Sequence, residues 1–326
     1  RITFTNNNTK FDTTGVQFQK ATLLDWVSFT YQLESPYRYS ARDRWIEQMN
    51  QQLIPLLGFG ITSPKDKGFY GYTDSFLLGN NWGMVAVGGN SQLGTVLVSI
   101  NGQGCSIAQK GWEARLKQVL QTQVASRLTR VDIAYDDYEG QFLTPEAARA
   151  ECQQQSQGIF FTQGRAPSWE LVGDWDSPTG RKTLYVGSGH SDKRLRIYTK
   201  GRQLGDPLSP WIRSELVLKH SKRFILPLDI LTHSTPYLAA AYSTADKAGP
   251  FQFLTDSEPS SRLKTAAQTI QISLAHQIRY GKRAVGKLVT TLKSLGYSDS
   301  EIVGMLSSSG TPEKLINTLE LLTRFS

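Results

Sequence analysis

The chain has 326 residues, of which 39% are hydrophobic and 20% charged, so it can form one large globular domain with an appendage, or two domains. No run of about 18 apolar residues is present, which argues against a membrane-spanning helix. The start of the sequence lacks the pattern of a secretion leader. The two cysteines, Cys105 and Cys152, lie far apart and lack the spacing of metal ligands. Together these features predict a protein of a reducing cytoplasm, without a disulfide scaffold or a zinc knuckle.

Positive charge is concentrated in two segments. The net charge is +8, yet residues 193–223 and residues 262–293 each carry +7, so the rest of the chain is acidic. Such concentration is typical of a surface that binds a polyanion. The alternative is that these segments are ordinary solvated faces of a basic protein. The cations that we single out as candidates for contact with a nucleic acid are Arg194, Arg202, Arg213, Arg279, Lys282, Arg283 and Lys287.

The first part of the chain predicts strands and helices in mixed order. Residues 23–33 are rich in aromatic and β-branched residues and predict a strand. Apolar residues then recur at helical spacing between Ser40, the expected cap, and Gly58, the expected end of the helix. Residues 84–100 predict two strands around a glycine-rich turn, and the GQG at 102–104 predicts a turn.

The middle of the chain predicts two more helices and a series of strands. Helical spacing runs from Trp112 to Val124 and leads into a strand at 128–137. Thr144 and Pro145 are a good cap and first residue for a helix that continues to about residue 156. Short strands are then expected near 158–162, 168–173, 182–187, 194–200 and 211–219.

Beyond about residue 235 the pattern changes to helix alone. Two apolar stripes follow each other, at 263–278 and 285–295, and Gly296 closes the second. Ser298 with Glu301 fits a capping box, and Thr311 before Pro312 opens a last helix. We therefore expect an α+β domain over residues 1–235, with a mostly antiparallel central sheet and flanking helices. A small helical bundle over residues 236–326 would bind DNA or serve an accessory role.

Several common chemistries lack their motifs. The four histidines form neither a His-hydrophobic-His clamp nor an HExxH helix. The chain has no GxxxxGK[ST] phosphate loop and no GxSxG elbow. These absences argue against ATP hydrolysis and against a serine hydrolase.

Carboxylates on predicted strands are the first candidates for chemistry. Alternation places Asp132 and Asp136 on one face of the 128–137 strand, and the 211–219 strand carries Glu215. A carboxylate inside an apolar strand is costly to bury unless it is paired or holds a metal. A salt bridge to an arginine is one explanation of these residues. The other is a site for Mg²⁺ or Mn²⁺, which prefer two or three such oxygens and leave positions open for a phosphate.

A tyrosine between two cations is the second candidate. Arg196, Tyr198 and Lys200 alternate along the 194–200 strand and would project from the same face. The cations would bind a phosphate and favour the phenolate, which makes Tyr198 suited to attack a phosphodiester. Packing within the sheet is the alternative use of this tyrosine.

Three blocks in this order resemble the replication initiation factor family, Rep_trans. They are TRVDIAYDD, then TLYVGSGHSDKRLRIYTKGRQLGDP, then WIRSELVLK with RFILPLDIL. The early LDWVSFTY and the NGQGC at 101–105 also look like family features. The chain looks most similar to initiators of CTX-type filamentous phages, and more distantly similar to rolling-circle plasmid initiators. The resemblance covers residues 20–235 and, more loosely, 277–312.

The resemblance implies a metal-dependent DNA nickase and ligase that starts rolling-circle replication without a His-hydrophobic-His motif. A tyrosine of the YVGS…RIYTK block would attack origin DNA and form a 5′-phosphotyrosyl intermediate. Tyr198 is preferred because it lies between Arg196 and Lys200, and Tyr185 is the alternative. The expected ligands of Mg²⁺ or Mn²⁺ are Asp132 and Glu215, with Asp136 as a further candidate.

The implied partners are origin DNA, both duplex and single-stranded, and a host polymerase and helicase in the bacterial cytoplasm. An inverted-repeat origin would suit a homodimer, although no sequence feature demonstrates one. Three other functions fit part of the sequence. A repressor or architectural DNA-binding protein explains the basic segments but not the strand carboxylates. A metal nuclease that uses water would leave Tyr198 a structural residue, and an RNA-binding protein would use the sheet and its aromatic residues.

Overall fold

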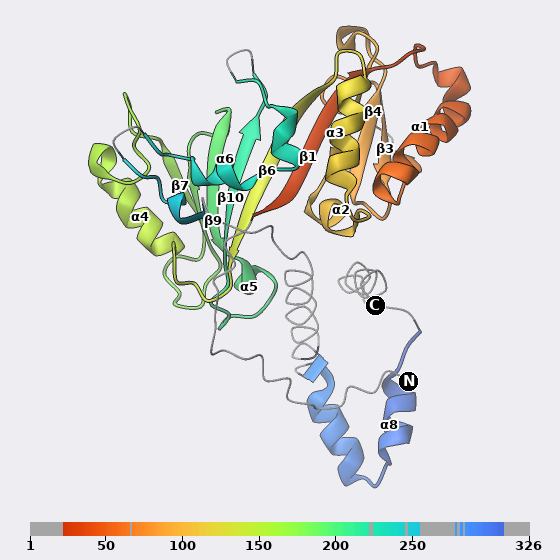
Figure 1. Ribbon diagram of the computed structural model, residues 1–326. Helices are drawn as coiled ribbons and strands as arrows, with labels where there is room; N and C mark the ends of the chain where they lie inside the picture. The colour runs from red at the N-terminus through yellow and green to blue at the C-terminus, as the bar shows by residue number, and fades with distance from the viewer. Residues whose placement is uncertain are drawn as a thin grey trace.

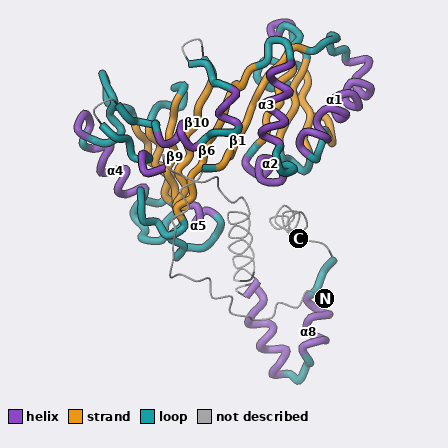
Figure 2. Tube along the Cα trace, viewed as in Figure 1, coloured by secondary structure: helices purple, strands orange, loops and turns teal. Residues whose placement is uncertain are grey.

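A ten-stranded sheet, antiparallel at every strand pair, forms the centre of the computed structural model (Figure 1). The structure describes residues 22–65, 67–221, 224–244, 247–254, 278, 281–282 and 284–309. Helices flank the sheet, as Figure 2 shows by colour, so the prediction of an α+β fold with a mostly antiparallel central sheet is confirmed.

The sheet has two halves that follow each other in the chain. The first half contains β1 (Leu23–Gln32), α1 (Arg42–Leu57), β2 (Ile61–Lys65), β3 (Asp74–Leu78), β4 (Gly83–Val87), β5 (Thr95–Ile100), α2 (Gly102–Ile107) and α3 (Trp112–Thr122). The second half contains β6 (Arg127–Asp137), α4 (Pro145–Gln153), β7 (Trp169–Gly173), β8 (Lys182–Val186), β9 (Lys193–Thr199), α5 (Lys200–Gln203) and β10 (Ile212–Lys219).

The two halves repeat one connectivity. From the middle of the sheet outward, the order is β1-β5-β4-β3-β2 on one side and β6-β10-β9-β8-β7 on the other. Helix α1 follows β1 as α4 follows β6. The halves meet where β1 pairs with β6, so the sheet continues without a break from one half to the other.

One face of the sheet is apolar and packs against the helices. In the first half this face holds Phe29, and Trp112 and Met49 are buried between the sheet and helices α3 and α1. In the second half α4 packs against β8 and β9. Figure 1 shows α1 and α3 lying over strands of the first half. Because side chains alternate along a strand, the opposite face receives the polar residues.

Most elements appear where the sequence predicts them, and the ends differ for local reasons. Gly58 ends α1 in the left-handed conformation, with φ of 85°, as expected of a C-terminal glycine. Ser40 does not cap α1, because it lies within a 3₁₀ turn and Ala41 precedes the helix. Helix α3 ends at Thr122, and Val124 is exposed rather than part of the apolar stripe.

Three further predictions are wrong or incomplete. Residues 158–162 form no strand. The GQG at 102–104 begins helix α2 instead of a turn, because the Asn101 side chain accepts a hydrogen bond from the Gly104 amide and caps it. The short strands β2 and β3 were not predicted.

The folded core extends beyond residue 235, the expected end of the first domain. Helix α6 (Thr235–Ala239) contributes Leu238 to the same buried cluster, and the 3₁₀ turn Gln252–Leu254 contributes Leu254, with Phe251 just before that turn. The sheet domain therefore extends at least to these residues.

The described part of the tail is helical. Residues 284–294 form a helix that Gly296 ends with φ of 90°, and α8 (Asp299–Leu306) begins with the predicted capping box of Ser298 and Glu301. The stripe at 263–278, apart from residue 278, and the start at 311–312 lie outside the described residues, so the bundle stays a prediction. Within the described ranges, no helix has both the length and the apolar character needed to cross a membrane.

Candidate active site

Strand register brings the predicted site residues onto the polar face of adjacent strands. In β10, Glu215 lies opposite Arg196 of β9, and Arg196 lies opposite Tyr185 of β8. On the other side, Val217 of β10 lies opposite Asp132 of β6. The period of two therefore places these side chains together over β8, β9, β10 and β6.

A cavity of about 430 Å³ opens among these residues. Its wall combines acids, cations and two aromatic rings, and it extends from β8 in the second half to β1 in the first. It is lined by Asp25, Trp26, Gly102, Arg130, Asp132, Tyr185, Gly189, Arg194, Arg196, Glu215, Val217 and Lys219. Carboxylates, arginines and a phenol that share one cavity are a suitable set for chemistry on a phosphodiester.

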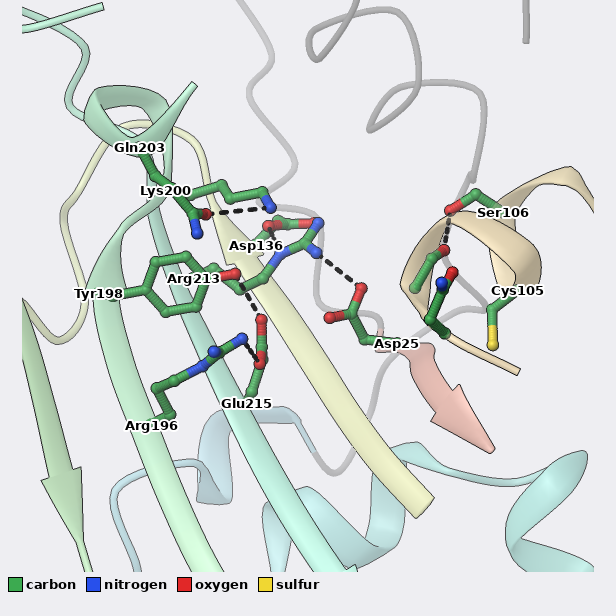
Figure 3. Close-up of polar contacts among 12 residues, drawn as sticks. Asp25, Cys105, Ser106, Asp136, Arg196, Tyr198, Lys200, Gln203, Arg213 and Glu215 are labelled. Atoms are coloured by element: carbon green, nitrogen blue, oxygen red, sulfur yellow. Dashed lines mark hydrogen bonds and ion pairs between the residues drawn. The ribbon is translucent and has the colours of Figure 1, made fainter. Parts of the chain in front are cut away.

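Glu215 links the two tyrosine-bearing strands to the cavity. It is 1% exposed, and its carboxylate accepts hydrogen bonds from the Tyr198 hydroxyl and from Arg196 (Figure 3). Burial and the charge of Glu215 raise the pKa of Tyr198 well above its usual value. Tyr198 is itself only 4% exposed, so its hydroxyl is engaged inside the protein.

Asp136 and Arg213 form a buried ion pair below the cavity. Arg213 donates from Nε and Nη2 to the two carboxylate oxygens of Asp136, each at 2.7 Å, and the indole of Trp211 donates to the same carboxylate at 2.7 Å. Arg213 also reaches Asp25 at 2.9 Å, as Figure 3 shows. These contacts correct two predictions. Asp136 pairs with Arg213 outside the lining of the cavity, so it is not placed with the other candidate ligands, and Arg213 is itself buried rather than exposed to DNA.

Asp132 is held by its neighbour in the same strand. Arg130 donates to both oxygens of Asp132, at 2.8 Å and 2.7 Å, and its guanidinium lies 4.6 Å from the centroid of the Trp26 ring. Burial raises the pKa of Asp132 although Arg130 opposes the shift. The salt bridge that was the alternative explanation of this carboxylate is therefore present, in a residue that still lines the cavity.

Tyr185 is the tyrosine that faces the cavity. It is half-buried, and the guanidinium of Arg194 lies 3.8 Å from its ring centroid while also pairing with Glu170 at 2.8 Å. Tyr185 also lies opposite Arg196 in the pairing of β8 with β9, and both residues line the cavity. Two arginines thus lie beside this phenol.

Lys200 and Arg202 lie next to Tyr198 but outside the cavity. Lys200 begins α5 rather than ending β9, and its ammonium lies 5.7 Å from the Tyr198 ring centroid. Burial and the charge of Arg213 lower the pKa of Lys200. Arg202 donates to the backbone of Gly180. A larger cavity, of about 770 Å³, touches Arg202 and the Tyr198 ring, but it holds none of the clustered carboxylates, so the smaller cavity is the better candidate for the chemistry.

Asp25 is the site residue that sequence reasoning missed. It lies at a register irregularity in β1, between Leu24 and Trp26, and this irregularity turns it toward the cavity. Burial raises the pKa of Asp25 to about 6, the nearby charge of Glu215 raises it as well, and Arg213 opposes both. The available signal was a lone acid within the apolar run LLDWVSF.

The carboxylates fit a divalent cation as a pair rather than as a triad. In the ranges that the structure describes, no three acidic, histidine or cysteine side chains gather closely enough to hold one ion. Asp25 and Glu215 both line the cavity, and the charge of Glu215 raises the pKa of Asp25. Mg²⁺ is commonly held by one or two carboxylates together with substrate phosphates and water, so this pair provides a suitable donor set.

Of the tail cations, two can be placed. Lys282 and Lys287 are exposed, and Lys287 belongs to the helix at 284–294. Arg279 and Arg283 lie outside the described residues, so all four stay predictions for contact with DNA.

The comparison with protein families agrees with the resemblance stated from the sequence. A family model described as replication initiation factor matches residues 126–306, more than half of the chain. No curated protein matches the chain. Among solved structures, a rolling circle replication initiator protein from Geobacillus stearothermophilus aligns with a TM-score of 0.48 and 18% identity, over 76% of this chain and 96% of that one.

Proposed function

The chain belongs to the replication initiation factor family, and from that premise we propose that it initiates rolling-circle replication by nicking and rejoining origin DNA through a tyrosine in its cavity. The observation that carries this proposal is the meeting of Tyr185, Arg194, Arg196 and the carboxylates in one cavity. The greater similarity to CTX-type phage initiators remains a prediction.

Tyr185 is the better nucleophile on geometric grounds. A tyrosine that attacks DNA must reach a phosphate that enters from outside. Tyr185 lines the cavity between two arginines, whereas Tyr198 is 4% exposed and donates its hydroxyl to Glu215. The order of preference inferred from the sequence is therefore reversed. Tyr198 and Arg196 instead position Glu215.

In the proposed step the Tyr185 oxygen attacks phosphorus and the bond from phosphorus to the 3′ oxygen breaks. The phenol proton passes to Asp132, whose pKa is raised by burial, and the 3′ oxygen takes a proton from solvent water as it leaves. Arg194 and Arg196 bind the phosphate oxygens and stabilise the charge that develops on them. The DNA 5′ end stays on the tyrosine as a phosphoester, so rejoining by the reverse step needs no nucleotide cofactor.

A divalent cation completes the proposal. Asp25 and Glu215 would hold Mg²⁺ or Mn²⁺, which would supply Lewis-acid polarisation of the scissile phosphate. Asp132, expected as a ligand, is proposed as the proton acceptor instead, and Asp136 lies outside the cavity lining. Glu215 would exchange its present bonds from Arg196 and Tyr198 for the ion. Origin DNA is the substrate, and the exposed Lys282 and Lys287 would add contacts to its phosphates.

The test uses supercoiled plasmid carrying the replicon's origin, with Mg²⁺ or Mn²⁺, and looks for a protein–DNA adduct on a denaturing gel. We expect Tyr185→Phe to abolish the adduct, and Tyr198→Phe to keep it while slowing its formation about tenfold. Tyr39→Phe, at an exposed tyrosine outside the cavity, is the matched control and should behave as the wild type.

Each other outcome points to a different function. An adduct lost only in Tyr198→Phe would return that tyrosine to the role of nucleophile. Nicking without any adduct would show a nuclease that uses water. Binding to the origin without nicking would leave a repressor or architectural protein.

A further inference from the structure

The connection between β2 and β3 ends in a tight turn with an unusual residue at its tip. Phe69 and Tyr72 exchange two backbone hydrogen bonds, at 3.1 Å and 3.0 Å, around Tyr70 and Gly71. Both central residues have positive φ, of 49° and 83°, which defines a type I′ turn. Asparagine, aspartate or glycine normally occupies the first of these positions. A bulky residue there is strained, and such strain is typical of functional sites.

The turn is built rigidly, and it presents Tyr70 to solvent. Tyr72 is buried against Ala86 and Leu97, and its hydroxyl bonds to Thr95 at 2.8 Å. The Gln92 side chain donates to the backbone oxygen of Tyr70 at 3.3 Å. Tyr70 is nevertheless 75% exposed as a residue, with the Phe69 ring centroid 4.2 Å from its own. The fold thus accepts a strained conformation and an exposed aromatic ring at the same residue.

This turn lies on the same face of the sheet as the catalytic cavity. Leu97, against which the turn packs, lies opposite Thr30 of β1, which shares a strand face with Trp26. Arg130 of β6 lies opposite Ser28 of β1, on the strand face that Thr30 and Trp26 share. Arg130 in turn stacks on Trp26 in the cavity wall.

From this placement we propose that Tyr70 is a base-stacking residue for single-stranded DNA. An unpaired base stacks on its ring while the adjoining phosphate passes to Arg130 and into the cavity. The inference rests on the proposed function, since it takes the DNA strand to enter that cavity. Tyr70 would add a binding subsite from the first half of the sheet. Among the described residues, that half otherwise provides Asp25, Trp26 and Gly102 to the cavity wall.

Binding is measured by fluorescence anisotropy with a labelled dT16 oligonucleotide and, separately, a 16-base-pair duplex, in EDTA so that no cleavage occurs. Stacking of one base on an aromatic ring is worth about 1–3 kcal/mol, so Tyr70→Ala should weaken dT16 binding about 5- to 150-fold and leave duplex binding unchanged. Tyr70→Trp should bind dT16 as tightly as the wild type. Tyr39→Ala, at a tyrosine of similar exposure outside the cavity, is the matched control.

A fourth variant separates stacking from a structural role. Tyr70→Asn suits the turn better than tyrosine does, so it should raise the melting temperature while losing dT16 affinity as Tyr70→Ala does. The proposal is overturned if Tyr70→Ala binds dT16 normally, or if single-strand and duplex binding fall together. The anisotropy assay measures binding alone. Its result therefore does not depend on whether the plasmid test detects nicking.

Discussion

The ion pair of Arg213 and Asp136 offers a quantitative test of the structure. Both side chains are almost fully buried, at 4% and 3% exposure, and two hydrogen bonds of 2.7 Å join them. Replacing Arg213 with Met removes the cation but leaves the carboxylate of Asp136 in place. Removing one partner of a buried pair costs about 3–5 kcal/mol, because the remaining charge stays buried. We expect that loss in the free energy of unfolding of Arg213→Met.

The double variant Asp136→Leu/Arg213→Met should be more stable than Arg213→Met alone. It removes both charges of the pair, and apolar residues of similar volume can replace a buried pair at little cost. The coupling energy from the double-mutant cycle should therefore be on the order of 2–3 kcal/mol.

Urea unfolding followed by circular dichroism measures both variants. With an m-value of about 3 kcal/mol/M, the single variant should shift the midpoint by about 1 M or more. If Arg213→Met costs less than about 1 kcal/mol, or if the two substitutions add, then the pair is not buried as described. The control is Lys200→Met, which should shift the midpoint much less. It removes a neighbouring cation that, among the described contacts, pairs with no acid at salt-bridge distance.

Three smaller predictions follow from other residues. Burial raises the pKa of Cys152 to about 11, so only about one Cys152 thiol in a thousand is ionised at pH 8. In a Cys105→Ser background, the rate of iodoacetamide labelling should therefore rise about tenfold per pH unit. Fast labelling at pH 8 would contradict the burial of Cys152. Lys287→Ala should reduce the slope of log K against log salt for duplex DNA by about one, and an unchanged slope would remove Lys287 from the interface. Burial alone would raise the pKa of Glu146, but the hydrogen bond from Lys182 lowers it. The pair therefore stabilises the fold above about pH 4.5, and this contribution is lost as the pH falls through the lowered pKa; at this exposure it stays below about 1 kcal/mol. Lys182→Met should reduce the dependence of the unfolding free energy on pH in that acid range.

Local periodicity was sufficient to group much of the site. Asp132 and Asp136 share a strand face because alternation is a property of any extended strand, and the same rule placed Arg196 beside Tyr198. Asp132 is paired by Arg130 of its own strand, but the partner of Asp136 depends on which strands are neighbours. The pairing of Arg213 with Asp136 arises from the β6–β10 register, which no single segment contains.

The missed features have the same origin. Asp25 reaches the cavity through a β1–β6 register irregularity, so its role depends on a strand about a hundred residues away in the sequence. Strand β2 was missed because Pro64 breaks the expected pattern, although β2 is an edge strand, where proline is tolerated. The preference for Tyr198 over Tyr185 used neighbours in sequence, and only the fold shows which ring faces the cavity.

The unbroken join between β1 and β6 has a mechanical consequence. Because β1 and β6 are hydrogen-bonded neighbours, the described part of the sheet has no hinge between its two halves. If the chain acts on origin DNA as proposed, a continuous sheet of this kind would not bend its two halves to fit a regular double helix. The duplex must distort instead, so origins whose base pairs open or kink at low cost should be processed fastest.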